Sequence, residues 1–175
     1  LFYSDGNILY NKNLEPMLNG SPLMNDAPLA AQRVLILKKP KNSELYYVFF
    51  VGAGTWPTNG KYGLWYDIVD MTGDNGLGEV IEKNVFINAA WDAQEKLIAV
   101  KHTNNDIWII THKLKENLFA SFLLTDNNLI ENPILSDATP VTQTGNRQGY
   151  MKISYDKKYF FNLYQTTSPY FFEVG

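Results

Sequence analysis

A recurring order of short apolar segments is the feature that most constrains how this chain can fold. A segment at 95–102 ends in a polar turn before an aromatic-rich segment at 107–110, and a third segment follows at 118–122. The same order returns at 149–156, 159–162 and 170–174, about 52 residues further along. Each segment has the length of a strand and is too short for a stable helix. The repeat therefore predicts antiparallel units of three or four strands.

Turn-forming residues separate these segments. Asn and Asp accept positive φ angles and bond back to their own backbone, so they are typical of hairpin turns. Such residues are concentrated at 40–43, 103–106, 126–128 and 156–158, and Asn75-Gly76 predicts a further reversal within 70–76. Tyr, Phe and Trp make up 14% of the chain and favour strands. We therefore predict an all-β protein.

A four-strand unit that recurs every ~40–60 residues is typical of a β-propeller blade. One small twisted sheet buries both of its faces only when neighbouring sheets stack against it. We predict a single propeller fragment over 1–175, with about three and a half four-stranded antiparallel blades; a β-sandwich is the alternative fold. The predicted units are a partial blade and inter-blade loop at 1–30, a blade at 31–94 with a long loop at 52–63, a blade at 95–148 and a partial blade at 149–175.

Charge, cysteine content and hydropathy exclude several classes of function. The net charge of −3 is too weak to attract nucleic acid or an anionic membrane. No apolar stretch approaches the ~18 residues of a membrane-spanning helix. Cysteine is absent, which excludes disulfides, thiolate metal sites and a cysteine nucleophile. The sequence begins at Leu1 within what reads as a strand, and we expect the chain to be a piece of a longer protein.

Several segments resemble, in their order, a known group of proteins. The strongest match lies at 66–85, and the others lie at 1–6, 11–13, 17–20, 38–49, 95–102, 106–112 and 149–152. This order is similar to the propeller-like N-terminal region of Bacteroidetes surface proteins exported by the type IX secretion system, often with a type B sorting domain. The resemblance implies a many-domain parent that is extracellular or on the outer-membrane surface. It implies no defined activity.

Candidate catalytic and metal-binding residues do not form a recognisable motif. A glycosidase needs two carboxylates about 5–9.5 Å apart, and nothing in the sequence brings together two of Asp5, Asp67, Asp92 and Asp106. His102 and His112 are weak candidates for a metal pair, because no third ligand lies at motif spacing. The alternative is that each histidine fixes a turn by hydrogen bonding. We expect no enzymatic activity and no cofactor.

Aromatic residues near predicted loops are the best candidates for ligand binding. Trp56 and Tyr62 lie in or beside the loop at 52–63, and Trp91-Asp92 lies where one blade passes to the next. In a propeller these connections emerge on one face. Exposed aromatic rings with polar neighbours are typical of surfaces that bind sugars or peptides, although the rings equally well pack over the blade junction. The predicted ligand-binding residues are Trp56, Tyr62, Trp91, Asp92 and Arg147.

These observations favour a non-catalytic module for adhesion or for recognition of a glycan or protein. A carbohydrate-active hydrolase and a purely structural spacer are the alternatives. Alternating apolar residues, such as Tyr47 and Phe49 or Ile107 and Ile109, predict blade faces that pack on neighbours. The two end units leave such faces bare. We therefore expect other segments of the parent protein, or another copy of the chain, to cover them.

Overall fold

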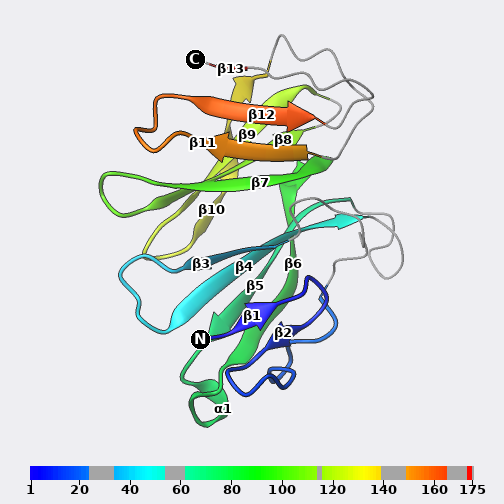
Figure 1. Cartoon of the computed structure of the whole chain (residues 1–175), viewed down its shortest axis with the longest axis vertical. Helices are drawn as coiled ribbons and strands as arrows, with labels where there is room; N and C mark the ends of the chain where they lie inside the picture. The colour runs from blue at the N-terminus through cyan, green and yellow to red at the C-terminus, as the bar shows by residue number, and fades with distance from the viewer. Residues whose placement is uncertain (24–33, 54–61, 114–115, 139–148, 165–172, 175) are drawn as a thin grey trace.

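The computed structural model describes residues 1–23, 34–53, 62–113, 116–138, 149–164 and 173–174 (Figure 1). These residues form strands and a single four-residue helical turn, α1 (Gly73–Gly76), so the predicted all-β class is confirmed. The strands are β1 (Tyr3–Ser4), β2 (Leu9–Tyr10), β3 (Val34–Lys38), β4 (Leu45–Ala53), β5 (Tyr62–Asp70), β6 (Glu79–Trp91), β7 (Ala93–Lys101), β8 (Ile107–Lys113), β9 (Leu118–Leu124), β10 (Leu129–Asp137), β11 (Gly149–Ile153), β12 (Phe160–Tyr164) and β13 (Glu173–Val174).

The strands form four antiparallel sheets whose strand order follows the chain. Two sheets have four strands, β3-β4-β5-β6 and β7-β8-β9-β10, while β11-β12-β13 has three and β1-β2 has two. Figure 1 shows the sheets following one another along the molecule in chain order. Four consecutive strands, each paired with the next, form the meander of a propeller blade. The predicted four-stranded units are therefore present as blade-like sheets.

A large apolar core lies between the two four-stranded sheets. Tyr47 and Phe49 of β4 are buried in it, as are Ile109 of β8 and Phe122 of β9. These residues lie at alternating positions in their strands, because successive side chains of a strand point to opposite faces. The alternation that the sequence predicted for Tyr47, Phe49 and Ile109 is thus confirmed. Leu45 and Ile107 pack against the same core.

Each four-stranded sheet also packs on its other face. Val48 and Val69 face Phe2, Leu9 and other residues of the N-terminal segment in a second core. Phe119 of β9 lies with Met151 of β11 in a third core, which joins the second four-stranded sheet to the three-stranded sheet. Both faces of the two four-stranded sheets are therefore covered, as stacking of blade-like sheets requires.

The first strands of the two four-stranded sheets and of the three-stranded sheet lie on the same side of the stack. Strand β7 contacts both β3 and β11, and at the other edge β6 contacts β10. In a propeller, blades arranged around a common axis place their first strands next to one another and their fourth strands next to one another. The chain passes from one four-stranded sheet to the next at Asp92, because β6 ends at Trp91 and β7 begins at Ala93. The second four-stranded sheet thus begins at Ala93, two residues before the predicted unit at 95–148.

The connection between β5 and β6 is a left-handed turn. Asp74, Asn75 and Gly76 have positive φ angles of 45°, 54° and 82°. The short segment α1 is therefore not a regular right-handed helix. Asn, Asp and Gly are the residues that adopt this conformation at least cost. The sequence predicted a reversal at Asn75-Gly76, and the chain does reverse there.

Candidate functional site

The loops of the molecule gather at two opposite ends of the stacked sheets. One end, which we call the hairpin end, carries the turns between β3 and β4, β7 and β8, β9 and β10, and β11 and β12. The other end, which we call the junction end, carries Tyr62, Trp91, Asp92, Lys113 and Glu116. A meander places alternate turns at opposite ends of a sheet, so this division follows from the strand order.

Three of the predicted ligand-binding residues meet at the junction end. The backbone N–H of Asp92 donates a hydrogen bond of 2.8 Å to the carbonyl oxygen of Tyr62. Trp91 lies directly opposite Gly63 in the pairing of β5 with β6. Asp92 is buried and has a φ angle of 69°, a conformation that Asp adopts more readily than most residues. The sharp turn at Asp92 therefore brings Tyr62 and Trp91 to one edge.

Gly63 allows this close approach. A Cβ atom at Gly63 would collide with the carbonyl oxygen of Ala90 and the Cα atom of Trp91. The two strands therefore come together at the junction end only because Gly63 has no side chain. Sequence reasoning did not single out Gly63.

The ring of Trp91 is 45% exposed and lies beside a buried cation. The Nζ atom of Lys113 is 6.0 Å from the centroid of the Trp91 ring, which is within the range of a cation–π contact. The same Nζ atom forms an ion pair of 2.6 Å with Glu116. The ammonium group thus lies near the aromatic ring and the carboxylate, and it restricts the orientation of the exposed indole. Sequence reasoning missed Lys113 and Glu116, although their i,i+3 spacing after a strand was a signal.

Two other predicted residues, Trp56 and Arg147, lie outside the described residues. The structure therefore brings together Tyr62, Trp91 and Asp92, and it adds Lys113 and Glu116 to them. An exposed aromatic ring near the partly exposed Glu116 carboxylate offers both stacking and hydrogen bonding to a ligand.

The four carboxylates considered for catalysis lie in four separate elements. Asp5 accepts hydrogen bonds from the backbone N–H groups of Asn7 and Ile8 in the turn between β1 and β2, which lowers its pKa. Asp106 accepts a hydrogen bond of 2.7 Å from the Asn104 side chain in the turn between β7 and β8, as its predicted turn position implies. Asp92 lies at the junction end, and Asp67 lies within β5.

Asp67 is a carboxyl group buried inside strand β5. Its side chain is fully buried, and burial raises its pKa to about 6. The backbone N–H of Asn84 donates a hydrogen bond of 2.6 Å to Asp67 Oδ1, which partly opposes that rise. Within the described part of the chain, Oδ2 of Asp67 has no hydrogen-bond partner.

The two histidines lie at opposite ends of the β7–β8 hairpin. His102 is exposed in the turn, where its Nδ1 atom is 2.8 Å from Oδ1 of Asn104. His112 is buried near the end of β8, and its Nε2 atom is 3.2 Å from Oδ1 of Asn117. They are therefore not a metal pair, and no group of three potential metal ligands occurs in the residues the structure describes. His102 bonds within its turn, as the alternative interpretation holds.

A buried lysine between two sheets was not expected from the sequence. Lys96 of β7 is fully buried, and its Nζ atom donates a hydrogen bond of 3.1 Å to Oδ1 of Asn162 on β12. Burial lowers the pKa of Lys96 to about 7. Burial also lowers the pKa of His112 to about 4, and the nearby charge of Lys96 adds to that effect. The only sequence signal was a charged residue inside an apolar strand.

The chain matches no family model, no curated protein and no solved structure. Across the described ranges, no helix is long and apolar enough to cross a membrane. The fold and the junction end together define a class: an all-β module of stacked, blade-like antiparallel sheets with an exposed aromatic ring at the passage between two of them.

Proposed function

We propose that this chain is a non-catalytic recognition module that binds a glycan or protein through its junction end. The observation that carries the proposal is the exposed side chain of Trp91, whose ring orientation the Lys113 ammonium group restricts. Aromatic rings that are fixed before binding lose little conformational entropy when a ligand stacks on them. The neighbouring Glu116 carboxylate, which is partly exposed, adds a polar group for orienting the ligand.

The resemblance to exported Bacteroidetes surface proteins supports a place for this module outside the cell. In this proposal the chain belongs to a larger exported protein, and it contributes adhesion or recognition at the outer-membrane surface or in the medium. Further segments of that protein, or another copy of the chain, cover the outer faces of the end sheets. Adhesion through a rigid β-module agrees with a binding surface formed by loops on a packed scaffold.

Binding measurements on the purified chain test the proposal. We expect neutral glycans or peptides on an array to bind the chain, and Trp91→Ala to weaken that binding at least tenfold because the stacking ring is lost. The control is Tyr155→Ala, since Tyr155 is fully exposed in a turn at the hairpin end. Thermal unfolding of both variants shows whether the fold is retained.

Three other results would contradict the proposal in different ways. Release of reducing sugar from a bound glycan would support the carbohydrate-active hydrolase instead. Silence of the glycan and peptide arrays would support a structural spacer. If Trp91→Ala and Tyr155→Ala weakened binding equally, the binding surface would not be specific to the junction end.

A further inference from the structure

A groove lined by lysines opens at the hairpin end, at the opposite end of the sheets from Trp91. The groove has a volume of about 420 Å³ and lies between the turn after β3 and the hairpin of β7 and β8. Its lining contains no acidic residue, although the chain as a whole carries a net charge of −3. The lining residues are Lys38, Lys39, Pro40, Lys41, Lys101, Asn105 and Ile107.

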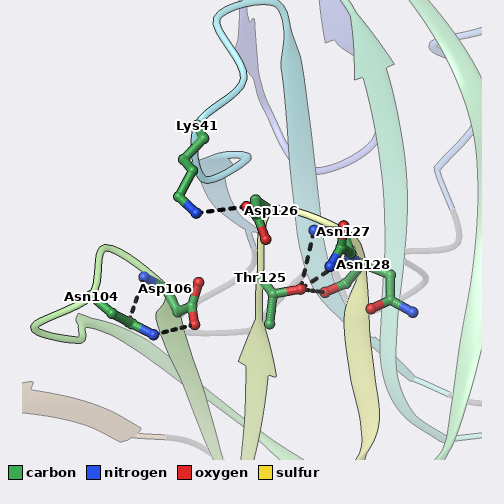
Figure 2. A network of polar contacts seen from close by, with 7 residues as sticks. All are labelled: Lys41, Asn104, Asp106, Thr125, Asp126, Asn127 and Asn128. Carbon is green, nitrogen blue, oxygen red and sulfur yellow. Dashed lines mark hydrogen bonds and ion pairs between the residues drawn. The ribbon is translucent and has the colours of Figure 1, made fainter.

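The ammonium groups around this groove are only partly neutralised. Figure 2 shows Lys41 pointing to Asp126, and their Nζ and Oδ2 atoms are 2.7 Å apart. The Nζ atom of Lys38 lies 5.8 Å from the centroid of the Tyr46 ring. Lys39 and Lys101 form no ion pair with any residue that the structure describes. Their positive charges therefore remain available to an anionic ligand.

A neighbouring turn brings one more positive charge to the groove. The Nζ atom of Lys157, in the turn between β11 and β12, donates a hydrogen bond of 3.0 Å to the carbonyl oxygen of Lys101. Hairpins of three different sheets thus contribute ammonium groups to one region of the surface. Lysines from separate, packed elements form a positive region that does not require any one flexible loop to move.

We propose that this groove binds the anionic groups, sulfate or carboxylate, of an acidic saccharide. Its volume lies within the range of small-molecule sites and suits one or two sugar rings. Ammonium groups are point charges that bind sulfate or carboxylate without the paired geometry of arginine. Pro40 and Ile107 provide apolar surface for the faces of a sugar ring, and the exposed Asn105 amide offers hydrogen bonds to hydroxyl groups.

The backbone around the groove argues against an extended peptide. The N–H groups of Lys39, Asn42 and Asn105 donate to the carbonyl oxygens of Leu45, Lys39 and His102, so they are already bonded within their own turns. These turn N–H groups are therefore not available for pairing with a peptide backbone.

The carboxylates beyond the lining argue against nucleic acid. Asp106 and Asp126 lie on the turns that flank the groove, and Figure 2 shows Asp106 bonded to Asn104 and Asp126 paired with Lys41. Two fixed negative charges on the flanking turns repel a continuous phosphate backbone more than they repel a short ligand bound by Lys39 and Lys101, which form no ion pair with described residues. A short acidic saccharide is thus the ligand that the geometry favours.

The test uses the full chain and three defined oligosaccharides: a sulfated heparin fragment, an oligogalacturonate and a neutral maltose oligomer of equal length. We expect calorimetry to detect binding of the sulfated or the carboxylated oligomer and not of the neutral one. Raising sodium chloride from about 50 to 200 mM should weaken that binding several-fold, because the contacts are charged. Which of the two anionic oligomers binds more tightly distinguishes sulfate from carboxylate.

Paired variants locate the binding. Lys39→Gln combined with Lys101→Gln should weaken binding at least tenfold, whereas Lys12→Gln combined with Lys152→Gln should change it less than twofold. Lys12 and Lys152 are exposed and lie outside the groove lining. Amide NMR signals of Lys101 and Asn105 should shift on binding, which reports the site even in a destabilised variant.

The proposal is overturned if neither anionic oligomer binds, or if the control pair weakens binding as much as the groove pair. Tighter binding of oligoglutamate or of a single-stranded oligonucleotide would overturn it in favour of those ligands. Trp91 takes no part in this experiment. If no acidic saccharide binds the groove, the proposed function of the junction end is unaffected. If Trp91→Ala leaves ligand binding at the junction end unchanged, the groove proposal is unaffected.

Discussion

At the scale of single residues, three buried ionisable groups make the stability of the fold depend on pH. Asp67, Lys96 and His112 all lie inside strands, where burial disfavours their charged forms. A group whose pKa differs between the folded and unfolded chain makes the free energy of unfolding change with pH. Each of the three residues therefore changes the free energy of unfolding over its own range of pH, and a substitution can test each contribution.

The parent chain should lose stability as pH rises from about 4 to 6, and Asp67→Asn should remove that loss. The pKa of Asp67 is about 6 in the folded chain and near its ordinary value of 3.8 in the unfolded chain. The folded chain therefore holds a proton that the unfolded chain releases, and the stability from this group disappears as pH rises through 6. The variant keeps an acceptor for the Asn84 N–H. We expect it to be more stable than the parent at pH 7, by roughly 1–2 kcal/mol, in urea unfolding.

A parallel pH profile for the parent and Asp67→Asn between pH 4 and 6 would contradict this assignment. Asp70→Asn is the matched control, because Asp70 lies at the end of the same strand and accepts hydrogen bonds from Thr72 in the exposed turn. We expect the control to retain the slope of the parent.

The parent chain should gain stability as pH rises above about 7, and Lys96→Met should remove that gain. The pKa of Lys96 is about 7 in the folded chain, below its ordinary value of 10.5. The unfolded chain therefore binds the proton more tightly over that window, and the free energy of unfolding of the parent rises as pH increases from 7 to 10. The variant has no such group, so we expect a flat profile there and higher stability than the parent below pH 7. Urea unfolding across this range measures both effects.

The same variant should also change the acid side of the profile. His112 has a pKa of about 4 in the folded chain against 6.5 ordinarily, so stability is lost as pH falls through this range. Removing the charge of Lys96 raises the pKa of His112 and reduces that loss. Lys152→Met, at an exposed position on β11, is the control. An unchanged acid profile in Lys96→Met would mean that the two buried groups do not interact.

At the scale of elements, the pairing of β5 with β6 depends on one residue without a side chain. Gly63→Ala places a methyl group against the backbone of Ala90 and Trp91. We expect a loss of roughly 2–3 kcal/mol in the free energy of unfolding, because a strand must shift to make room. Gly76→Ala is the comparison: it has open space around it and a φ angle of 82°, so only the conformational cost of about 1 kcal/mol applies.

Urea unfolding of the two glycine variants separates the two costs. An equal loss in both variants would mean that backbone conformation, rather than the collision at the junction end, makes Gly63 necessary. A shift in the fluorescence of Trp91 in Gly63→Ala alone would support the collision.

The strands were predictable because local signals define them. Alternating apolar residues such as Tyr47 and Phe49 fall on one face, and Asn-rich turns such as the one at Asn104 and Asp106 end the strands. The passage between units at Trp91-Asp92 was predicted, but its length of one residue was not, because no turn composition there marks where β7 begins. A buried Asp with positive φ there depends on how two sheets meet, which no local pattern records.

The candidate site was only partly predictable for the same reason. Trp91 and Tyr62 were found because aromatic residues near loops are conspicuous in a sequence. Lys113 was not found, because its contact with Trp91 forms only when β6 and β8, which belong to different sheets, lie side by side. The lysine groove likewise draws on the separate β3–β4 and β7–β8 turns.

At the scale of the whole molecule, the outermost described sheet has an apolar outer face. In the pairing of β11 with β12, Tyr150 lies opposite Leu163 and Lys152 lies opposite Phe161, so all four share the face turned away from Met151. Tyr150 and Phe161 are 47% and 37% exposed. Exposed aromatic residues grouped on one sheet face are typical of a surface that another element covers.

The purified chain should therefore associate in a concentration-dependent way. We expect sedimentation velocity to show species larger than a monomer at high concentration, and Tyr150→Ser combined with Phe161→Ser to reduce them. Tyr155→Ser removes an equally exposed ring from a turn and is the control. A monomer at every concentration would show that neither a second copy nor other segments are needed to cover this face.

The single-residue passage at Asp92 has a consequence for how the length of such a chain can vary. Between β6 and β7 there is no slack, so one inserted residue would shift the phase of inward- and outward-facing side chains in β7 relative to β6. Side chains of β7 that now face the other four-stranded sheet would then face the three-stranded sheet, and the reverse would happen to their neighbours. The turn at 154–159 is exposed and absorbs extra residues without such a shift. Natural length variation and engineered insertions should therefore concentrate at the hairpin end and avoid Asp92.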